Sequence, residues 1–418
     1  MVGYFFCGLN KKQYLALAIN THCFLDDRIL TEYSRTKMDL KKQPLLILLF
    51  ALVLCQCKND PPISTQKNDP SDYAPTSNKW GFIDKKGQLI IPAEYDDIRA
   101  FSEGLAVVRK GDLWGFINTQ NKVIIPFQYK AAWSFHNGLA RVQTQDRGII
   151  FIHKNGKELP SKWDEAGDMA EGFAWVRKST KYGFINQKGT LAIDTIFDKV
   201  NSFHQQRAIA KKGKYYGLID TTAVWVIAPV YQKISHFNKG LARAKKGGKW
   251  GFINTKNEWQ IKPQFFSAED FHHQKAAVAT ENGYVLIDKE GRPSSPYYSF
   301  MQYGNAQRWI VEKDGLFGLI DNNGIEVIPC NLEQIYHFVE GVAPFQLQQL
   351  WGIMDTMGKI LITPQFGLAW DFNDQIARVF TEDGIAFINK QGAIVIPAKY
   401  LDVRDFSEGL AGVQFSKK

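Results

Sequence analysis

Lys79 to Asp112 reads KWGFIDKKGQLIIPAEYDDIRAFSEGLAVVRKGD, and the same pattern of residues returns along the rest of the chain. The first two copies start at Trp80 and Trp114, 34 residues apart (114 minus 80), and the later copies keep nearly the same spacing. Their starts are Ile149, Tyr182, Tyr216, Trp250, Tyr284, Phe317, Trp351 and Ile385. Periods of this size are typical of arrayed supersecondary units. The sequence therefore predicts one array of ten units over residues 79–418, without a separate domain.

Each copy predicts three short strands joined by tight turns. The apolar run Trp80–Ile83 is followed by Asp84 and, three positions on, by Gly87. An Asp that accepts backbone N–H groups and a Gly that tolerates positive φ are what a type I turn with a left-handed bulge requires. The β-branched run ending at Pro92 predicts a second strand, placed at a strand end or a sheet edge because proline has no N–H to donate. Leu105–Val108 predicts the third, and no segment shows a helical period.

The aromatic residue that opens most copies predicts a core shared between neighbours. One Trp buries roughly 150 to 250 Å², and a unit of this size cannot enclose it alone. The glycine after the aromatic, Gly81 in the first copy, is expected to leave room for the next unit's aromatic ring. Copies three and seven, which open with Ile149-Ile150 and Tyr284-Val285 in place of Trp-Gly, are expected to kink or pack loosely.

The length and number of the copies favour an open array. Propeller blades usually need about 40 to 50 residues, and propellers close with about four to eight blades. No strand remains at either end of the array to close a ring. We therefore predict an all-β, open and curved solenoid of three-stranded repeats, with a closed β-propeller-like arrangement as the alternative.

The repeated residues also carry a family resemblance. Lys-Trp-Gly-Phe-Ile-Asp, then Gly, Ile-Pro and Phe-x-Glu-Gly-Leu-Ala-x-Val, resembles the WG (or KWG) repeat family of bacterial β-repeats. The resemblance covers residues 79–418. It implies β-repeats and no particular activity.

The residues before the array predict export. The apolar run Leu45–Cys55 follows Lys41 and Lys42. It has the length of a signal-peptide core, about 7 to 15 residues, rather than the roughly 20 that span a bilayer. An uncleaved anchor helix is the alternative.

The next residues, Leu54–Asp60, resemble the end of a bacterial lipoprotein signal peptide. That resemblance implies lipidation at Cys57, with Cys55 as the alternative, and an outer-membrane lipoprotein of the cell envelope. We expect residues 1–37 to be an over-extended start before Met38. Residues 38–57 are then the signal peptide, and 58–78, rich in Asn, Asp, Pro and Ser, are expected to be a flexible tether.

Composition argues against several functions. The net charge of +9 is spread over all copies without a dense basic run, so nucleic-acid binding is not expected. Cys330 is the only cysteine in the array, which excludes a disulfide framework there. His136, His204 and His272 share one column, but residues two repeats apart lie roughly 20 Å from each other if sheets stack at about 10 Å, too far to share a metal. No catalytic motif appears, and no cofactor is expected.

One variable column predicts a binding surface. It follows a position that is apolar in every copy, such as Ile98, and alternation points it outward. Trp, Tyr and Arg are the usual binding anchors. The five such residues in this column are Arg99, Trp133, Tyr336, Trp370 and Arg404. The alternative is that these side chains cover neighbouring loops.

The leading hypothesis is a non-enzymatic, monomeric cell-envelope lipoprotein whose repeats bind a protein or glycan partner, with the membrane reached only through the lipid. The alternatives are a structural envelope protein that self-associates and a hydrolase with an unrecognised site.

Overall fold

A computed structural model describes residues 78–146 and 148–415 of the chain. All regular elements in these residues are strands, and the all-β prediction is confirmed. Accordingly, the described part of the chain holds no helix with the length and apolar character needed to cross a membrane. The predictions for residues 1–77, including the start at Met38 and lipidation at Cys57, lie outside the described residues.

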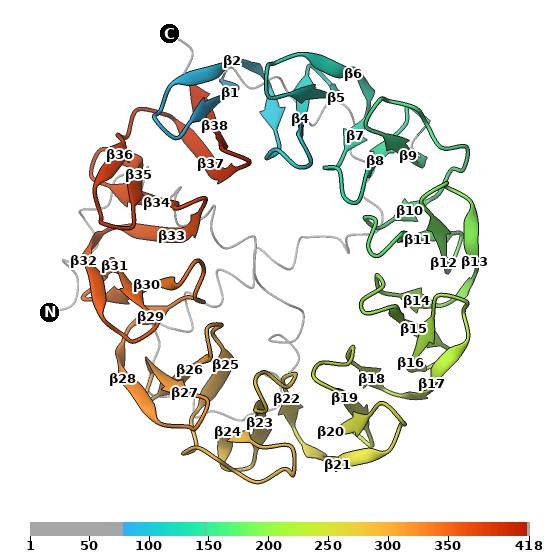
Figure 1. Cartoon of the computed structure of the whole chain (residues 1–418), viewed down its shortest axis with the longest axis vertical. Helices are drawn as coiled ribbons and strands as arrows, with labels where there is room; N and C mark the ends of the chain where they lie inside the picture. The colour runs from blue at the N-terminus through green and yellow to red at the C-terminus, as the bar shows by residue number, and fades with distance from the viewer. Residues whose placement is uncertain (1–77, 147, 416–418) are drawn as a thin grey trace, which may run out of the picture. The chain divides into compact units, whose positions relative to one another are not determined.

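The strands form ten antiparallel sheets, which we call blades 1 to 10 (Figure 1). Blade 1 consists of β37 (Asp402–Ser407), β38 (Leu410–Phe415), β1 (Lys79–Asp84) and β2 (Leu89–Tyr95), and blade 2 of β3 (Asp97–Ile98), β4 (Leu105–Lys110), β5 (Leu113–Asn118) and β6 (Val123–Tyr129). Blade 3 consists of β7 (Ala131–Ala132), β8 (Leu139–Gln143) and β9 (Ile149–His153), and blade 4 of β10 (Glu165–Ala166), β11 (Phe173–Lys178), β12 (Lys181–Asn186) and β13 (Leu191–Phe197). Blade 5 consists of β14 (Lys199–Val200), β15 (Arg207–Lys212), β16 (Tyr215–Asp220) and β17 (Trp225–Tyr231). Blade 6 consists of β18 (Lys233–Ile234), β19 (Leu241–Lys246), β20 (Lys249–Asn254) and β21 (Trp259–Phe265), and blade 7 of β22 (Ser267–Ala268), β23 (Ala276–Thr280) and β24 (Gly283–Ile287). Blade 8 consists of β25 (Phe300–Tyr303), β26 (Arg308–Lys313), β27 (Leu316–Asp321) and β28 (Glu326–Leu332), and blade 9 of β29 (Gln334–Ile335), β30 (Val342–Leu347), β31 (Leu350–Asp355) and β32 (Ile360–Phe366). Blade 10 consists of β33 (Leu368–Asn373), β34 (Ile376–Thr381), β35 (Gly384–Asn389) and β36 (Ile394–Ile396).

The two ends of the array close it into a ring. β1 pairs with β38 in antiparallel register, from Lys79 opposite Phe415 to Asp84 opposite Leu410. In Figure 1 the first and last strands accordingly lie side by side in blade 1. The predicted open solenoid is therefore wrong, and the closed propeller-like alternative is confirmed.

Each copy contributes to two blades, and this offset explains the closure. The first copy supplies β1 and β2 to blade 1, and β3 and β4 to blade 2. Ten copies in phase therefore leave two halves of one sheet at the ends of the array. The prediction of three strands per copy is also wrong, because it missed β3 and its equivalents. β3 is 2 residues long, too short for an alternating pattern to be visible in the sequence.

Most of the innermost strands are short, and most of the perimeter strands contain a proline. β10, β14 and β25 lie towards the centre of the ring, whereas β13, β17 and β28 lie on its outside (Figure 1). Pro92 belongs to β2, the outer edge strand of blade 1, which pairs only with β1. The predicted edge position of this proline is confirmed, and a missing N–H there also discourages pairing with another chain.

Neighbouring blades share their cores, as the repeat predicts. Trp80 and Phe82 of blade 1 belong to one buried cluster with Ala106 and Val108 of blade 2. The ring of Phe82 meets that of Phe101 edge-on, with their centroids 4.9 Å apart. Burial of such rings contributes about 25 cal/mol per Å² of apolar area, so the aromatic residues stabilise the junctions between blades.

The glycine after the leading aromatic has a different role from the predicted one. A Cβ placed on Gly81 would lie 2.5 Å from the carbonyl oxygen of Ile91 and 2.9 Å from the backbone nitrogen of Ala93. Both atoms belong to β2 of the same blade, where the pairing with β1 is irregular between Trp80 and Phe82. Gly81 therefore admits the backbone of the outer strand rather than the ring of the next unit.

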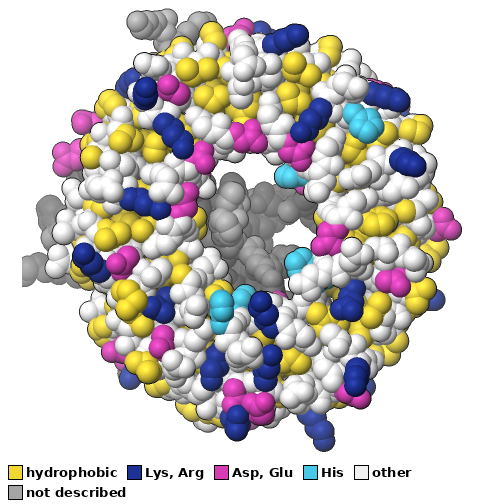
Figure 2. Space-filling view, viewed as in Figure 1, with side chains coloured by type: hydrophobic (Ala, Val, Ile, Leu, Met, Phe, Trp, Pro, Cys, Tyr) yellow, Lys and Arg dark blue, Asp and Glu magenta, His cyan; other side chains and the backbone are white. Residues whose placement is uncertain are grey.

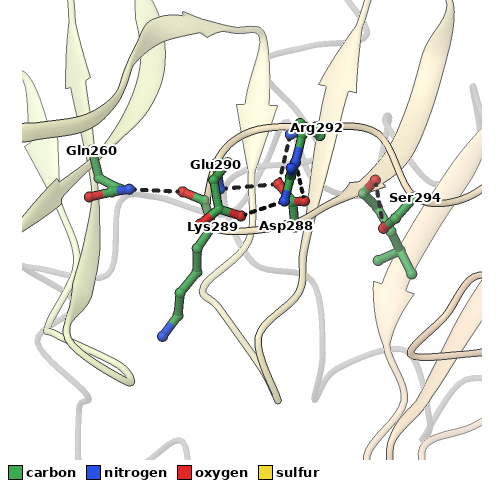
Figure 3. Close-up of polar contacts among 7 residues, drawn as sticks. Gln260, Asp288, Lys289, Glu290, Arg292 and Ser294 are labelled. Atoms are coloured by element: carbon green, nitrogen blue, oxygen red, sulfur yellow. Dashed lines mark hydrogen bonds and ion pairs between the residues drawn. The ribbon is translucent and has the colours of Figure 1, made fainter.

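The predicted Asx-type turn is confirmed, and it is retained even in copy seven (Figure 3). There Asp288 Oδ1 accepts hydrogen bonds from the backbone N–H groups of Glu290 and Arg292, at 3.1 and 2.8 Å. Arg292 Nε also donates to Asp288 Oδ2 at 2.7 Å. Gln260 of the neighbouring β21 donates to the carbonyl of Lys289 at 3.2 Å, so the turn also contacts blade 6.

Copies three and seven depart from the others in their outer strands. In blades 3 and 7 the fourth strand is replaced by isolated bridges, Ile149 with Trp163 and Tyr284 with Tyr298. The two copies thus depart from the repeat at the perimeter, where Pro160 and Pro296 follow serine-containing or charged segments rather than β-branched runs.

Candidate binding site at the inner rim

The five predicted binding residues lie on five consecutive blades. Tyr336 follows β29 of blade 9, Trp370 lies in β33 of blade 10 and Arg404 lies in β37 of blade 1. Arg99 follows β3 of blade 2, and Trp133 follows β7 of blade 3. These strands are the inner ones of their blades, and Figure 2 shows the opening that they surround. Closure therefore brings residues from both ends of the array to one half of the ring, and we call the five residues the rim arc.

Three side chains of the rim arc stack on the leading tryptophan of the next copy, which is in the same blade. Cζ of Arg99 lies 5.7 Å from the ring centroid of Trp114, and Cζ of Arg404 lies 4.8 Å from that of Trp80. The ring centroids of Tyr336 and Trp351 are 4.8 Å apart. Tyr336 remains 37% exposed despite this contact. The stacking holds each side chain in place at the rim while part of its surface stays accessible.

The two rim-arc tryptophans pack against arginines that bridge adjacent blades. Cζ of Arg141 lies 4.7 Å from the ring centroid of Trp133, and Cζ of Arg378 lies 4.7 Å from that of Trp370. Each arginine also forms an ion pair with an aspartate of the next blade, and Arg243 repeats the arrangement. The ion pairs join Nε and Oδ1 of Arg141 and Asp168 at 2.8 Å, Arg243 and Asp270 at 3.1 Å, and Arg378 and Asp405 at 2.5 Å. The arginine of each pair is mostly buried and the aspartate is part-exposed, so each pair ties two blades together at the edge of the rim.

Asp371 occupies the aspartate position of this bridge on blade 10 without the arginine. In the bridge to Asp405, the arginine is Arg378, 27 positions earlier in the sequence. The residue 27 positions before Asp371 is Pro344. Asp371 Oδ1 is buried and has no hydrogen-bond partner among the described residues. Burial, assisted by the nearby Asp405 carboxylate, raises the pKa of Asp371, and Arg378 only partly opposes the shift.

Replacing Asp371 with Asn is expected to stabilise the ring at neutral pH. Because the folded-state pKa of Asp371 is raised, ionisation of this group lowers the stability as pH rises above the unfolded value of 3.8. Asp371→Asn removes that cost, so we expect a gain of about 1 kcal/mol near pH 7. Near pH 3, where both states are protonated, the gain should vanish. Urea titrations at the two pH values measure it.

Asp168→Asn is the matched control, because it weakens the bridge to Arg141 and should destabilise the ring near pH 7. An Asp371→Asn effect that is the same at both pH values would show that the buried charge is not its cause.

Carboxylates at the corner before the third long strand link neighbouring blades. Glu408 accepts a hydrogen bond from the N–H of Gly104 at 2.9 Å, across the junction of blades 1 and 2. Glu171 accepts from the N–H groups of Gln205 and Gln206, both at 2.7 Å. The corner is also a tight turn, as predicted, with φ of 52° at Glu408. These carboxylates therefore serve the fold.

A groove opens between blades 4 and 5, next to the rim arc. It has a volume of about 550 Å³, and Trp175 and Tyr182 line it on the side of blade 4. Their ring centroids are 5.8 Å apart. Gly167 is the residue of blade 4 in the rim-arc column, and a Cβ there would lie 2.0 Å from Trp175 Nε1. Trp175 thus fills the place that a rim-arc side chain takes on other blades.

Two histidines lie at the same groove. The rings of His204 and His236 are edge-to-face with centroids 5.4 Å apart. Burial lowers the pKa of His236 to about 4, and the neighbouring His204 adds to the shift. His236 is therefore neutral at physiological pH. Within the residues that the structure describes, no group of three or more His, Cys, Asp or Glu side chains is placed to hold a metal ion.

Sequence reasoning missed the bridging arginines and Trp175. The signal for the arginines was present, because Arg141, Arg243 and Arg378 each precede their aspartate by 27 residues. Trp175 gave no such signal, since it stands in the same variable column as these arginines, which elsewhere holds valine, isoleucine, alanine, proline or glycine. In copy seven the residue in the apolar column is Met301, which pairs with Val311.

Comparison with solved structures gives only distant similarity. A eukaryotic initiation factor is 12% identical, with 70% of this chain and 95% of that chain covered at a TM-score of 0.45. The computationally designed Ika8 protein is 10% identical, with 71% and 96% covered at 0.35. BamB from Moraxella catarrhalis is 9% identical, with 76% and 96% covered at 0.33. All three TM-scores lie below 0.5, and comparison with curated proteins gave no match.

A closed ring of small antiparallel sheets built from tandem copies defines a β-propeller-like repeat scaffold. The WG containing repeat matches nine segments, which together span more than half of the chain, and the protein belongs to this family. The matched segments are 80–114, 114–147, 151–182, 182–216, 216–250, 250–284, 317–350, 351–383 and 386–418. The unmatched stretch between them is copy seven, whose outer strand is reduced to bridges.

Proposed function

We propose that the protein is a non-enzymatic scaffold of the bacterial cell envelope, anchored by a lipid at Cys57, that binds a protein or glycan partner through the rim arc. The observation that carries the proposal is the position of the rim arc on five consecutive blades. Residues that are more than 200 positions apart in the sequence thereby offer one surface to a single partner.

The chemistry of the rim arc suits binding. Trp, Tyr and Arg dominate the energetics of interfaces because they bury large areas and make directional contacts. Stacking of Arg404 on Trp80 and of Tyr336 on Trp351 holds these side chains in place before a partner arrives. Less conformational entropy is then lost on binding.

The carboxylates near the rim arc favour a binding role over hydrolysis. A glycosidase needs two carboxyl groups, one as acid and one as base or nucleophile. Asp371 and Asp405 are one pair of carboxyl groups at the rim arc that act on each other electrostatically. Asp405, however, accepts from both Nε and Nη2 of Arg378, at 2.5 and 2.8 Å, which commits it to the bridge between blades.

Alanine substitution of the rim-arc tryptophans tests the proposal. A binding screen of residues 79–418 against envelope glycans and envelope proteins identifies the partner. Trp133→Ala and Trp370→Ala are each expected to weaken its binding by about tenfold, since truncating an interface anchor costs 1 to 2 kcal/mol or more.

Trp259→Ala is the matched control, because Trp259 lies on the outer strand β21. The Trp259→Ala variant should bind the identified partner with the same affinity as the unmodified protein. Unchanged affinity in both rim-arc variants, for every partner found, would contradict the proposed binding surface.

A further inference from the structure

The groove between blades 4 and 5 has the size and lining of a small-ligand site. Its volume of about 550 Å³ falls within the range of about 300 to 1,000 Å³ typical of such sites. It is lined by blade 4 on one side and blade 5 on the other, with His236 of blade 6 beyond. None of the rim-arc residues lines it.

One wall of the groove is aromatic and is made by a local exception in the sequence. The repeat places Gly167 where Trp133 and Trp370 stand on their blades. The indole of Trp175 occupies the space so created, and a Cβ on Gly167 would lie 2.0 Å from Nε1 and 2.4 Å from Cε2 of that ring. Tyr182 extends the wall at a ring-plane angle of 52°. Both side chains are half-buried, so they present aromatic surface to the groove.

The facing side of the groove combines the apolar Val200 and Phe203 with polar residues. Asn201 and Ser202 supply an amide and a hydroxyl, and His204 and His236 supply imidazoles. Amide and hydroxyl groups, and the neutral imidazole of His236, each offer both a donor and an acceptor. His236 Nδ1 is buried without a hydrogen-bond partner among the described residues, so this wall has unused hydrogen-bonding capacity.

The charge near the groove disfavours an anionic ligand. Lys199 is the one lining residue with a fixed charge. Glu171 is close enough to both histidines to act on them electrostatically, and hydrogen bonds from Gln206 and Gln205 keep its own pKa low. A carboxylate or phosphate would therefore meet a fixed negative charge as well as the single lysine.

We propose that this groove binds a neutral oligosaccharide, with one sugar ring stacked on Trp175 and its hydroxyls bonded to Asn201, Ser202 and His204. A pyranose ring combines a flat apolar face with a rim of hydroxyl groups that both donate and accept. Those two features match the aromatic wall and the polar groups that face it. The site involves neither Cys57 nor the rim arc, and so it stands independently of the proposed function.

Titration of the full chain with neutral tetrasaccharides tests the site. The probes are cellotetraose, xylotetraose, maltotetraose and chitotetraose, followed by tryptophan fluorescence and by calorimetry. At least one should bind with a Kd below about 1 mM, which is typical of weak but specific recognition. Trp175→Ala should weaken that binding at least tenfold.

A second variant keeps the test valid if Trp175→Ala unfolds blade 4. Gly167→Ala retains the indole but displaces it, and it should cause a similar loss of affinity. Trp225→Ala, on the outer strand β17, should bind as the unmodified protein does.

The proposal is overturned if none of the four tetrasaccharides binds at about 10 mM, or if both Trp175→Ala and Gly167→Ala bind as the unmodified protein does. It is also overturned if decaproline, and no sugar, binds in a Trp175-dependent way, because the groove would then recognise a polyproline peptide. Loss of affinity in Trp133→Ala, with Trp175→Ala and Gly167→Ala unaffected, would place the sugar at the rim arc and would likewise overturn the groove as its site.

Discussion

A chain that ends after Leu401 is expected to lose most of its folding stability. The deletion removes β37 and β38, and β38 pairs with β1 over its whole length. It also removes the buried side chains of Val403, Phe406 and Val413, and exposes Phe387 and Ile396 of blade 10. At about 1.5 to 3 kcal/mol for each buried side chain, the loss is on the order of 10 kcal/mol. That is comparable with the total stability of a typical domain, about 5 to 15 kcal/mol.

The size of this effect distinguishes a ring from an open array. In an open solenoid, removing a terminal unit costs only one interface between neighbours. In the ring the same deletion leaves β1 and β2 without the rest of their sheet and exposes the facing side of blade 10 as well. We therefore expect loss of a cooperative urea transition, together with rapid amide exchange in β1. A chain ending after Phe415, which keeps both strands, is the control, and addition of peptide 402–415 should partly restore protection. A truncated chain with an unchanged transition would contradict the closed ring.

Local chemistry made the repeat predictable. The Asp84–Gly87 turn, the edge position of Pro92 and the shared aromatic core each follow from the properties of one residue type. Asp84 Oδ1 indeed accepts from the N–H groups of Lys86 and Gln88, at 2.9 and 2.8 Å, and Gly87 has a φ of 74°. Such features depend only on neighbours along the chain, so a single sequence contains them.

Closure depended on information that no single copy contains. A strand of two residues, Asp97–Ile98, gives no periodic signal, yet it is what lets 34 residues form a four-stranded blade. Whether the array curves enough for β38 to meet β1 is set by small rotations summed over ten junctions. The candidate site shared this limit. The column that holds Trp133 and Trp370 could be identified, but its assembly on adjacent blades required the ring.

Gly217→Ala is expected to destabilise the ring by about 2 to 4 kcal/mol. Gly217 lies in β16, and a Cβ there would lie 2.2 Å from the carbonyl oxygen of Ile227 and 2.8 Å from the carbonyl carbon of Ala228. Both are backbone atoms of β17, which is held against β16 by the pairs on either side of the glycine. The outer strand cannot retreat without losing that pairing.

The expected loss of stability in Gly217→Ala is opposite in sign to the intrinsic preference of strands for alanine, so the substitution tests the close backbone contact. Alanine in a strand is normally favoured over glycine by roughly 0.5 to 1 kcal/mol. Gly148→Ala is the matched control, because the nearest atoms to its Cβ belong to the flexible side chain of Lys162, and we expect a change within about 0.5 kcal/mol. Urea denaturation of the two variants compares them directly. If glycine at this position only made room for an aromatic ring of the next blade, that ring could shift and Gly217→Ala would be as mild as the control. A large difference between the two variants is therefore what close approach of the outer strand requires.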